Sequence, residues 1–280
     1  MWPLLEALPK SLGQMTIILG VITLSIIILS YMLHYSGLLD VILQKKALVI
    51  VEPREHKYLQ EVCENFDKNM SKSWDLYVFH GKSAGDFAQQ ATATIKGRRV
   101  YLIPLETDNL DGDGYNALFK SLDFWNQVNA EDILVFQTDT VLCSASEFKI
   151  NDFMKYDYIG CGSYAGAIGN KKDVWGNKYS KGNSFYGIGG LSFRKNSFQK
   201  QCIKKYPDIA ADYPEDVFFS NCVEQSVNKP ESAEVLANFC TQDSFSKRSF
   251  GAHNTWYMKK EDREPFYAFC PAARILETKS

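Results

Sequence analysis

The stretch ILVFQTDTVL, residues 133–142, joins a strongly apolar run to a polar break. Its first four residues have the composition of a strand buried on both faces. The chain then becomes polar at Gln137, Thr138 and Asp139, and the apolar pattern resumes at Val141. Because an unpaired carboxylate is costly to bury, an acid here either has a partner or lies outside the core. If the strand ends at this break, Asp139 lies at the edge of a sheet.

Other apolar runs of strand length precede this one and alternate with segments of helical periodicity. The runs stand at residues 47–51, 74–79 and 99–104, and the periodic segments at 58–70, 83–94 and 115–128. This alternation predicts an α/β domain with a mostly parallel sheet flanked by helices.

The second half of the chain has a different pattern. We predict strands at residues 156–160 and 191–194, a helix at 198–205, and a further helix that opens at Pro214. Residues 163–182 are rich in Gly, Asn, Lys and Ser without a period, which predicts a loop.

The N-terminal segment at residues 16–33 contains eighteen residues without a charge, the lower limit for a helix that crosses a bilayer. A secretory signal or a buried helix fits less well. We therefore expect a tail over 1–15, a single membrane-spanning anchor over 16–33, a linker over 34–46 and a folded domain over 47–280. The flanking lysines leave the orientation open, including a type II arrangement with a lumenal domain.

The overall composition is that of a globular protein. The 280 residues are 45% hydrophobic, and 31 basic against 33 acidic residues give no field that would attract nucleic acid. Seven scattered cysteines show neither metal-ligand spacing nor the density of a disulfide scaffold. One glycosylation sequon, Asn69-Met70-Ser71, is compatible with a lumenal domain.

Asp139 is the first candidate for a functional role. In open α/β sheets, ligands bind beyond the carboxyl ends of the strands, where the strand order reverses. Mg²⁺ and Mn²⁺ prefer oxygen ligands and need only one or two protein carboxylates when a diphosphate supplies the others. Asp139 is therefore a candidate ligand of a cation that bridges phosphates. The alternative is a strand-end aspartate that caps a turn.

Three glycines form a second motif at Gly187, Gly189 and Gly190. They precede a predicted strand, so they do not match the dinucleotide fingerprint, which follows a strand and opens a helix. Such glycines either let the backbone pass close to a bound sugar or form an ordinary turn.

Two acids and a histidine complete the candidates. Glu215 and Asp216 stand at a predicted helix start, where the helix dipole alone favours carboxylates. A transferase also needs a carboxylate to deprotonate an acceptor hydroxyl. His253 is one of four histidines, and the sequence leaves open whether it is structural or a ligand.

Seven segments, in chain order, resemble a domain-of-unknown-function family of glycosyltransferase-like proteins with the GT-A nucleotide-sugar fold. They are ALVIVEPREHKYL, WDLYVFHG, FQTDTVLC, YDYIGCGS, YGIGGLSFRK, PEDVFFS and FGAHNTW, and they cover about residues 47–256. The resemblance implies a hexosyltransferase-like activity. A sugar would pass from a nucleotide-diphosphate-sugar donor to a hydroxyl of a carbohydrate or glycoconjugate acceptor.

The same resemblance implies residue roles. It assigns the donor to Val51, Glu52, Pro53, Arg54, Gln137, Thr138 and Asp139, a Mn²⁺ or Mg²⁺ cofactor to Asp139 and His253, and the acceptor side to Gly187, Gly189 and Gly190. Asp216 or Glu215 would be the catalytic base. The stereochemical outcome is left open.

One departure from the family pattern bears on the metal. A typical GT-A site has Asp-x-Asp, whereas this chain has Gln137-Thr138-Asp139 and thus one carboxylate fewer. Metal-independent transfer is one alternative, and an inactive carbohydrate- or nucleotide-sugar-binding protein is another. A Rossmann methyltransferase is disfavoured because Glu52-Pro53-Arg54 stands where its glycine-rich turn would be.

Overall fold

The computed structural model describes residues 12–35, 45–162, 186–207, 213–245 and 247–277. The loop expected at residues 163–182 and most of the linker expected at 34–46 lie outside these ranges. Contacts divide the chain into two compact units, Met1–Gln44 and Lys45–Ser280.

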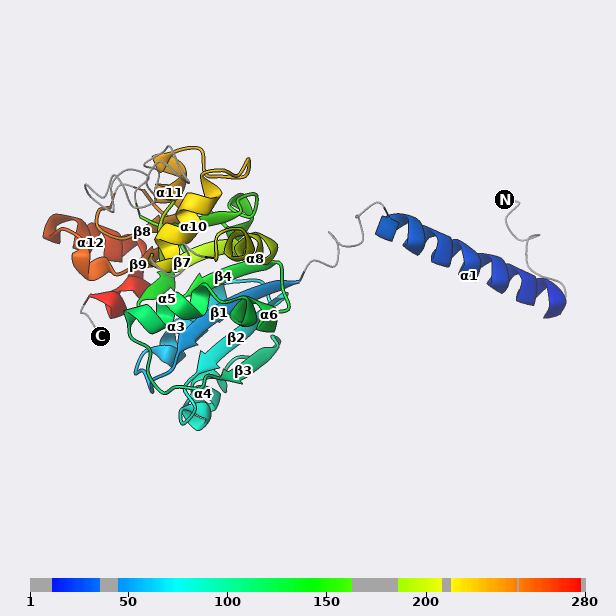
Figure 1. Cartoon of the computed structure of the whole chain (residues 1–280), viewed down its shortest axis with the longest axis horizontal. Helices are drawn as coiled ribbons and strands as arrows, with labels where there is room; N and C mark the ends of the chain where they lie inside the picture. Colours follow the sequence, from blue (N-terminus) through cyan, green and yellow to red (C-terminus); the bar gives the residue numbers. More distant parts are fainter. Residues whose placement is uncertain (1–11, 36–44, 163–185, 208–212, 246, 278–280) are drawn as a thin grey trace, which may run out of the picture. The chain divides into compact units, whose positions relative to one another are not determined.

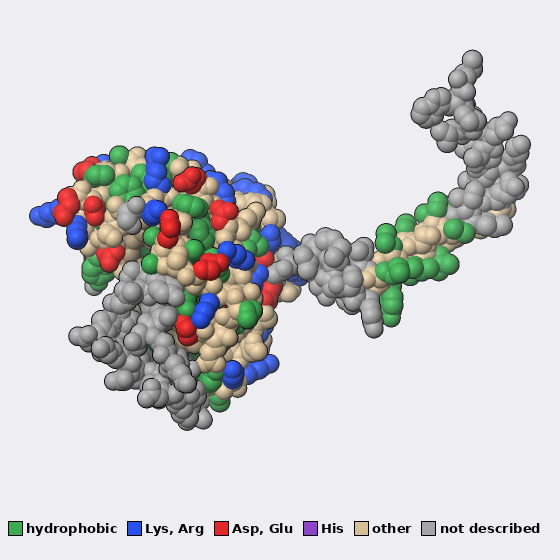
Figure 2. Space-filling model, turned by 90° about the horizontal axis from the view of Figure 1, so that it is seen from above, with side chains coloured by type: hydrophobic (Ala, Val, Ile, Leu, Met, Phe, Trp, Pro, Cys, Tyr) green, Lys and Arg blue, Asp and Glu red, His purple; other side chains and the backbone are tan. Residues whose placement is uncertain are grey.

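The first unit contains helix α1 (Leu12–Tyr35). Its described apolar side chains are exposed, among them Leu19 and Ile26 (Figure 2). Within the described ranges no helix is long and apolar enough to cross a membrane, so the anchor expected at residues 16–33 is not confirmed.

The described part of the second unit is built on a six-stranded sheet in the order β3-β2-β1-β4-β7-β6 (Figure 1). The strands are β1 (Lys46–Glu52), β2 (Trp74–His80), β3 (Val100–Pro104), β4 (Asp132–Phe136), β6 (Tyr158–Cys161) and β7 (Ile188–Lys195). Strands β1 to β4 are parallel, and β7 runs antiparallel to both β4 and β6. The predicted α/β class with a mostly parallel sheet is confirmed.

Helices cover both faces of this sheet because side chains alternate between the faces along each strand. Ile50 and Phe136 belong to the core on one face, which packs against α3 (Leu59–Asn69), α4 (Gly85–Thr92) and α11 (Ala233–Phe239). Val49 and Val135 belong to the core on the other, beneath α5 (Gly112–Phe119), α6 (Leu122–Gln127), α8 (Asn196–Lys205) and α10 (Glu215–Val223). The helix predicted at residues 115–128 is thus two helices, because Ser121 starts α6 by accepting a hydrogen bond from the amide of Asp123.

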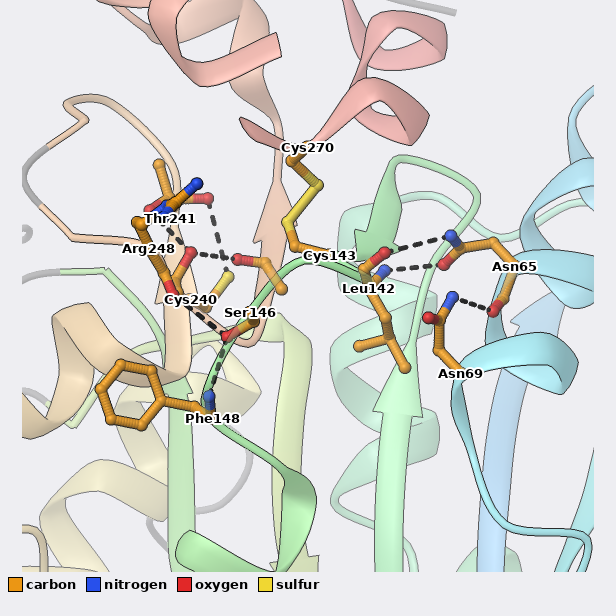
Figure 3. The surroundings of a disulfide bond; sticks show 12 residues. Asn65, Asn69, Leu142, Cys143, Ser146, Phe148, Cys240, Thr241, Arg248 and Cys270 are labelled. Atoms are coloured by element: carbon orange, nitrogen blue, oxygen red, sulfur yellow. Dashed lines mark hydrogen bonds between the residues drawn. A yellow bond between two sulfur atoms is a disulfide. The ribbon is translucent and has the colours of Figure 1, made fainter. Parts of the chain in front are cut away.

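A small second sheet follows the polar break. It has the order β5-β9-β8, with β5 (Thr140–Leu142), β8 (Cys240–Thr241) and β9 (Gly251–His253). The chain therefore leaves the large sheet after Phe136, and Leu142 belongs to another one. The Asn65 side chain pairs with the amide and carbonyl of Leu142 at 2.7 and 3.1 Å, which connects β5 to α3 (Figure 3).

Two disulfides anchor the small sheet, although the scattered cysteine spacing did not predict them. Cys143, just after β5, is bonded to Cys270 at the end of α12 (Lys260–Phe269) (Figure 3). Cys161, the last residue of β6, is bonded to Cys240 in β8. Short helices η1 (Ile150–Asp152), η2 (Thr255–Tyr257) and η3 (Pro271–Leu276) complete the described unit.

Candidate functional site

The strand order has its reversal between β1 and β4. From β1 the chain adds β2 and β3 on one side, and β4 then pairs with the other side of β1. Ligand crevices of open α/β sheets lie beyond the strand ends at such a switch point. Strand β1 ends at Glu52 and β4 at Phe136, so the predicted donor residues 51–54 and 137–139 lie at the ends of neighbouring strands.

Asp139 and His253 come together at this point. Asp139 lies in the turn between β4 and β5, where its carbonyl accepts a hydrogen bond from the amide of Asn254 at 3.1 Å. In the small sheet Thr140 is opposite His253. These pairings place His253 Nε2 3.6 Å from Asp139 Oδ1, so the two residues predicted to share a metal are neighbours.

The protonation of His253 makes this pair unusual. Its Nδ1 lies 3.1 Å from the side-chain oxygen of Gln242, an arrangement that suits the tautomer with the hydrogen on Nδ1. Burial lowers the pKa of His253, and the nearby Asp139 charge only partly opposes that shift. A neutral ring therefore directs the Nε2 lone pair toward the Asp139 carboxylate. Neither Nε2 nor Oδ1 has a hydrogen-bond partner in the part of the chain that the structure describes, and both atoms are buried.

The geometry of this Asp139–His253 pair suits a shared cation. Adjacent ligands at about 2.1 Å from an octahedral divalent ion lie about 3.0 Å apart, so the two atoms, 3.6 Å apart here, would approach each other slightly on binding. No cluster of three or more His, Cys, Asp or Glu side chains that could hold a metal occurs among the described residues. A cation here would therefore take its other ligands from a different side-chain type or from a bound ligand.

Gly190 and Gln137 border the same space. Val135 is opposite Ser192 in the antiparallel pairing of β4 and β7, and continuing this register sets Gln137 beside Gly190. A Cβ atom on Gly190 would collide with His253 Nε2 and Gln137 Oε1. Only glycine keeps this space open.

The Arg54 side chain places a positive charge just after the end of β1. Arg54 donates to both carboxylate oxygens of the buried Glu52, at 2.8 and 3.0 Å, and more than half of its side chain is exposed. The hydrogen bond to Glu52 raises the pKa of Arg54, with a smaller contribution from the charge of Asp139. A guanidinium held in this way, and still exposed, can bind a phosphate oxygen.

The two predicted catalytic acids have different environments. Glu215 accepts hydrogen bonds from Arg194 at 2.7 and 3.0 Å, and both side chains are buried. The Arg194 guanidinium lies 5.1–5.8 Å from the ring centres of Phe119, Trp125, Tyr158 and Phe219. Glu215 is thus one half of a buried ion pair that holds the start of α10 against β7.

Asp216 has the properties of a base. Burial is the main cause that raises its pKa to about 7, and the charge of Glu215 adds to it. A hydrogen bond of 2.7 Å from the Val217 amide and the charge of Arg194 oppose the shift. A carboxylate with a pKa near neutrality can take up a proton at physiological pH.

The three predicted acceptor-side glycines have separate surroundings. Gly187 has a φ of +103° and packs against the backbone of Gly160. Gly189 packs against Glu215 and Arg194, so a Cβ atom there would disrupt that ion pair. Only Gly190 among the three borders the Asp139–His253 pair.

Other residues at the site carried no sequence motif. Gln242 orients His253, and Tyr115 places a buried hydroxyl near Gln137. Asn254 is the one non-glycine residue with positive φ in the described ranges, at +51°, and it directly follows His253. Asparagine tolerates this left-handed conformation, which was the single signal available in the sequence.

Comparison with known families identifies the family to which the chain belongs. Residues 100–253 match the family described as "Protein of unknown function (DUF5672)", and the chain belongs to this family. The match runs from β3 to His253, so it includes Asp139, the β7 glycines and both acids of α10. It carries no link to glycosyltransferases. No curated protein matches the chain.

Proposed function

We propose that the domain is a metal-assisted glycosyltransferase of GT-A-like fold, which transfers a sugar from a nucleotide-diphosphate-sugar donor to an acceptor hydroxyl. The observation that carries the proposal is the Asp139–His253 pair, two buried lone-pair atoms 3.6 Å apart at the switch point of the sheet. Buried polar atoms in native proteins are normally satisfied, so this pair calls for a proton or a cation between its members, and the lowered pKa of His253 favours the cation.

A diphosphate is the ligand that best completes such a site. A hard cation held by two protein groups keeps coordination positions for phosphate oxygens. When bound, the cation would neutralise the charge that develops on the leaving diphosphate. Arg54, paired with Glu52, adds a positive charge whose field reaches Asp139. These features support a nucleoside diphosphate as the common part of the donor.

Asp216 is our candidate for the base. In transfer, the acceptor hydroxyl gives its proton to the Asp216 carboxylate. The freed oxygen forms a bond to the anomeric carbon, and the bond from that carbon to the diphosphate oxygen breaks. A pKa of about 7 leaves a usable fraction of Asp216 deprotonated at neutral pH. Glu215 is already occupied by Arg194.

One observation favours a second candidate, an inactive protein that binds nucleotide sugars. Gln137 stands where the first acid of a GT-A metal motif would be, which removes one negative charge from the site. A neutral amide oxygen can still coordinate a cation, but more weakly than a carboxylate.

The two disulfides support a domain that folds in an oxidising compartment, such as the lumen of the secretory pathway or the outside of the cell. The sequon is compatible with this, since Asn69 ends α3 and Ser71 is exposed. Peptide mapping of protein from its native source tests the proposal. Free thiols at Cys143, Cys161, Cys240 and Cys270 would contradict it.

Turnover of nucleotide sugars tests the main proposal. The full chain is incubated with Mn²⁺ and a panel of nucleotide sugars, with and without oligosaccharide acceptors, and release of nucleoside diphosphate is measured. We expect release from one donor and its loss in Asp139→Asn and Asp216→Asn. Mn²⁺-dependent binding without release would favour the inactive binding protein. Neither binding nor release would refute both.

A further inference from the structure

Tyr115 has a buried hydroxyl for which no partner in the described residues meets hydrogen-bond geometry. Its ring stacks on Phe119, with centroids 4.5 Å apart, so the side chain is held in the packed face beneath α5. The hydroxyl oxygen is buried and has no hydrogen-bond partner among the described residues. Buried tyrosine hydroxyls usually have a partner, so a ligand is the natural candidate for this one.

Groups from both parts of the site act on the pKa of this hydroxyl. They are Gln137 and Asp139 after β4, Glu215 at the start of α10, and its partner Arg194 in β7. The Gln137 side chain is close to the hydroxyl but does not meet the geometry of a hydrogen bond. Burial, followed by the charge of Glu215, raises the pKa of Tyr115. The hydroxyl therefore keeps its proton and can donate a hydrogen bond.

Two hydrogen bonds, one before Tyr115 and one just after it, fix the position of this residue in α5. Asp111 caps the helix by accepting a hydrogen bond from the Gly114 amide at 2.8 Å. Asn116, the next residue along, accepts one from the Glu215 amide at 2.9 Å and thereby joins α5 to α10. The placement of the hydroxyl therefore follows from two helices that are bonded to each other.

We propose that the Tyr115 hydroxyl donates a hydrogen bond to the sugar of the nucleotide-sugar donor. This inference rests on the proposed function. During transfer the sugar has to lie between the diphosphate, bound at the Asp139–His253 pair, and the base Asp216. Tyr115 has Gln137 as a neighbour on one side, and its helix is bonded to the start of α10 through Asn116 on the other, so we assign its hydroxyl to a sugar oxygen and not to the nucleoside diphosphate. It thereby contributes to the choice of sugar.

Tyr115→Phe is a precise test because it deletes one oxygen atom and keeps the ring. Tyr267→Phe is the matched control, since Tyr267 also has a buried hydroxyl without a partner in the described ranges but belongs to the core around α12. The full-length proteins are titrated calorimetrically, with Mn²⁺, with UDP-glucose, UDP-galactose and GDP-mannose. The tightest-binding of these probes is then compared with its own nucleoside diphosphate.

We expect Tyr115→Phe to weaken binding of the nucleotide sugar by at least about tenfold while the nucleoside diphosphate binds as to wild type. Tyr267→Phe should leave both affinities unchanged. Unchanged binding of the nucleotide sugar to Tyr115→Phe would overturn the inference alone, and so would an equal loss for both probes. Failure of wild type to bind any probe would overturn the proposed function with it. Denaturant unfolding should show Tyr115→Phe to be at least as stable as wild type, since no protein partner is lost.

Discussion

His253 Nε2 faces Asp139 Oδ1 across 3.6 Å, although Asp139 lies in the turn before β5 and His253 is the last residue of β9. In the tautomer that suits the Gln242 contact, the hydrogen is on Nδ1 and both facing atoms present lone pairs. Two buried lone pairs this close repel unless a cation or a proton lies between them. The unliganded protein therefore contains a destabilised pair that Mn²⁺ should relieve.

Gly190→Ala should abolish this response to Mn²⁺. The added methyl group would collide with His253 and Gln137 and so fill the space that the cation needs. We expect wild type to melt at a higher temperature with Mn²⁺ than with chelator, and the variant to lose this difference. Gly112→Ala is the control, because a Cβ atom on Gly112 would meet no other atom within 4 Å. A Gly190→Ala protein that keeps the full Mn²⁺ shift would rule out the cation at this place.

Asp216→Asn should remove one step from the pH profile of turnover. With a pKa of about 7, wild-type turnover should rise as the pH increases through 7, because only the deprotonated form is a base. The variant should turn over about a hundredfold more slowly, and its rate should no longer rise around pH 7. Asp113→Asn, an exposed acid of α5, is the control and should retain both.

The pH dependence of the unfolding free energy should also depend on Asp216. The pKa of Asp216 is raised in the folded state, so between about pH 4 and 7 the folded state keeps a proton that the unfolded state has released. The contribution of Asp216 to stability therefore falls as the pH rises through this window. Urea unfolding at pH 4.5 and 7.5 should show a smaller fall for Asp216→Asn than for wild type. Equal falls would mean that Asp216 is not buried enough to act as proposed.

Glu215→Gln should have a larger effect on the free energy of unfolding than on the rate of turnover. Removing one partner leaves the Arg194 charge buried, at a cost of about 3–5 kcal/mol in the free energy of unfolding. Adding Arg194→Met should recover part of that loss, because the uncompensated charge is then gone. Glu264→Gln, which breaks the exposed pair with Arg274, should change stability little. If Glu215→Gln were as stable as wild type and inactive, Glu215 and not Asp216 would be the base.

The Cys161–Cys240 disulfide should matter for both stability and the site. It joins β6 to β8, and β8 pairs with β9, which carries His253. The double variant Cys161→Ser/Cys240→Ser should lose about 2–5 kcal/mol of unfolding free energy and part of the Mn²⁺ shift. Reductant should lower the melting temperature of wild type more than that of the variant. Identical melting of the two proteins without reductant would show that this bond does not hold the small sheet.

The large sheet was predictable because its parallel strands are continuous apolar runs. The runs at residues 47–51, 74–79 and 133–136 correspond to β1, β2 and β4 within a residue or two. The small sheet was not predictable in the same way, since its strands have only two or three residues and no periodicity. Its disulfides join cysteines 127 and 79 residues apart, and such partners are set by the fold and not by spacing.

The candidate site was predictable in part. Asp139 was marked by the polar break after β4, and its neighbour His253 was suggested by the family resemblance alone. The sequence could not separate Glu215 from Asp216, because the difference lies in Arg194, a residue from another strand. Tyr115 gave no signal, since an aromatic residue at helical spacing is the usual sign of a core position.

The most direct test of the Asp139–His253 site is a calorimetric titration of UDP and GDP into wild type and Asp139→Asn, each with Mn²⁺ and with chelator. Asparagine keeps the shape of the side chain but removes the charge, so the variant should fold as wild type does. We predict Mn²⁺-dependent binding to wild type and a loss of at least about a hundredfold in the variant. A capping aspartate would instead lose about 1 kcal/mol of stability on substitution and leave nucleotide binding unchanged. Equal, Mn²⁺-dependent affinities of the two proteins would contradict the metal site and the function proposed from it.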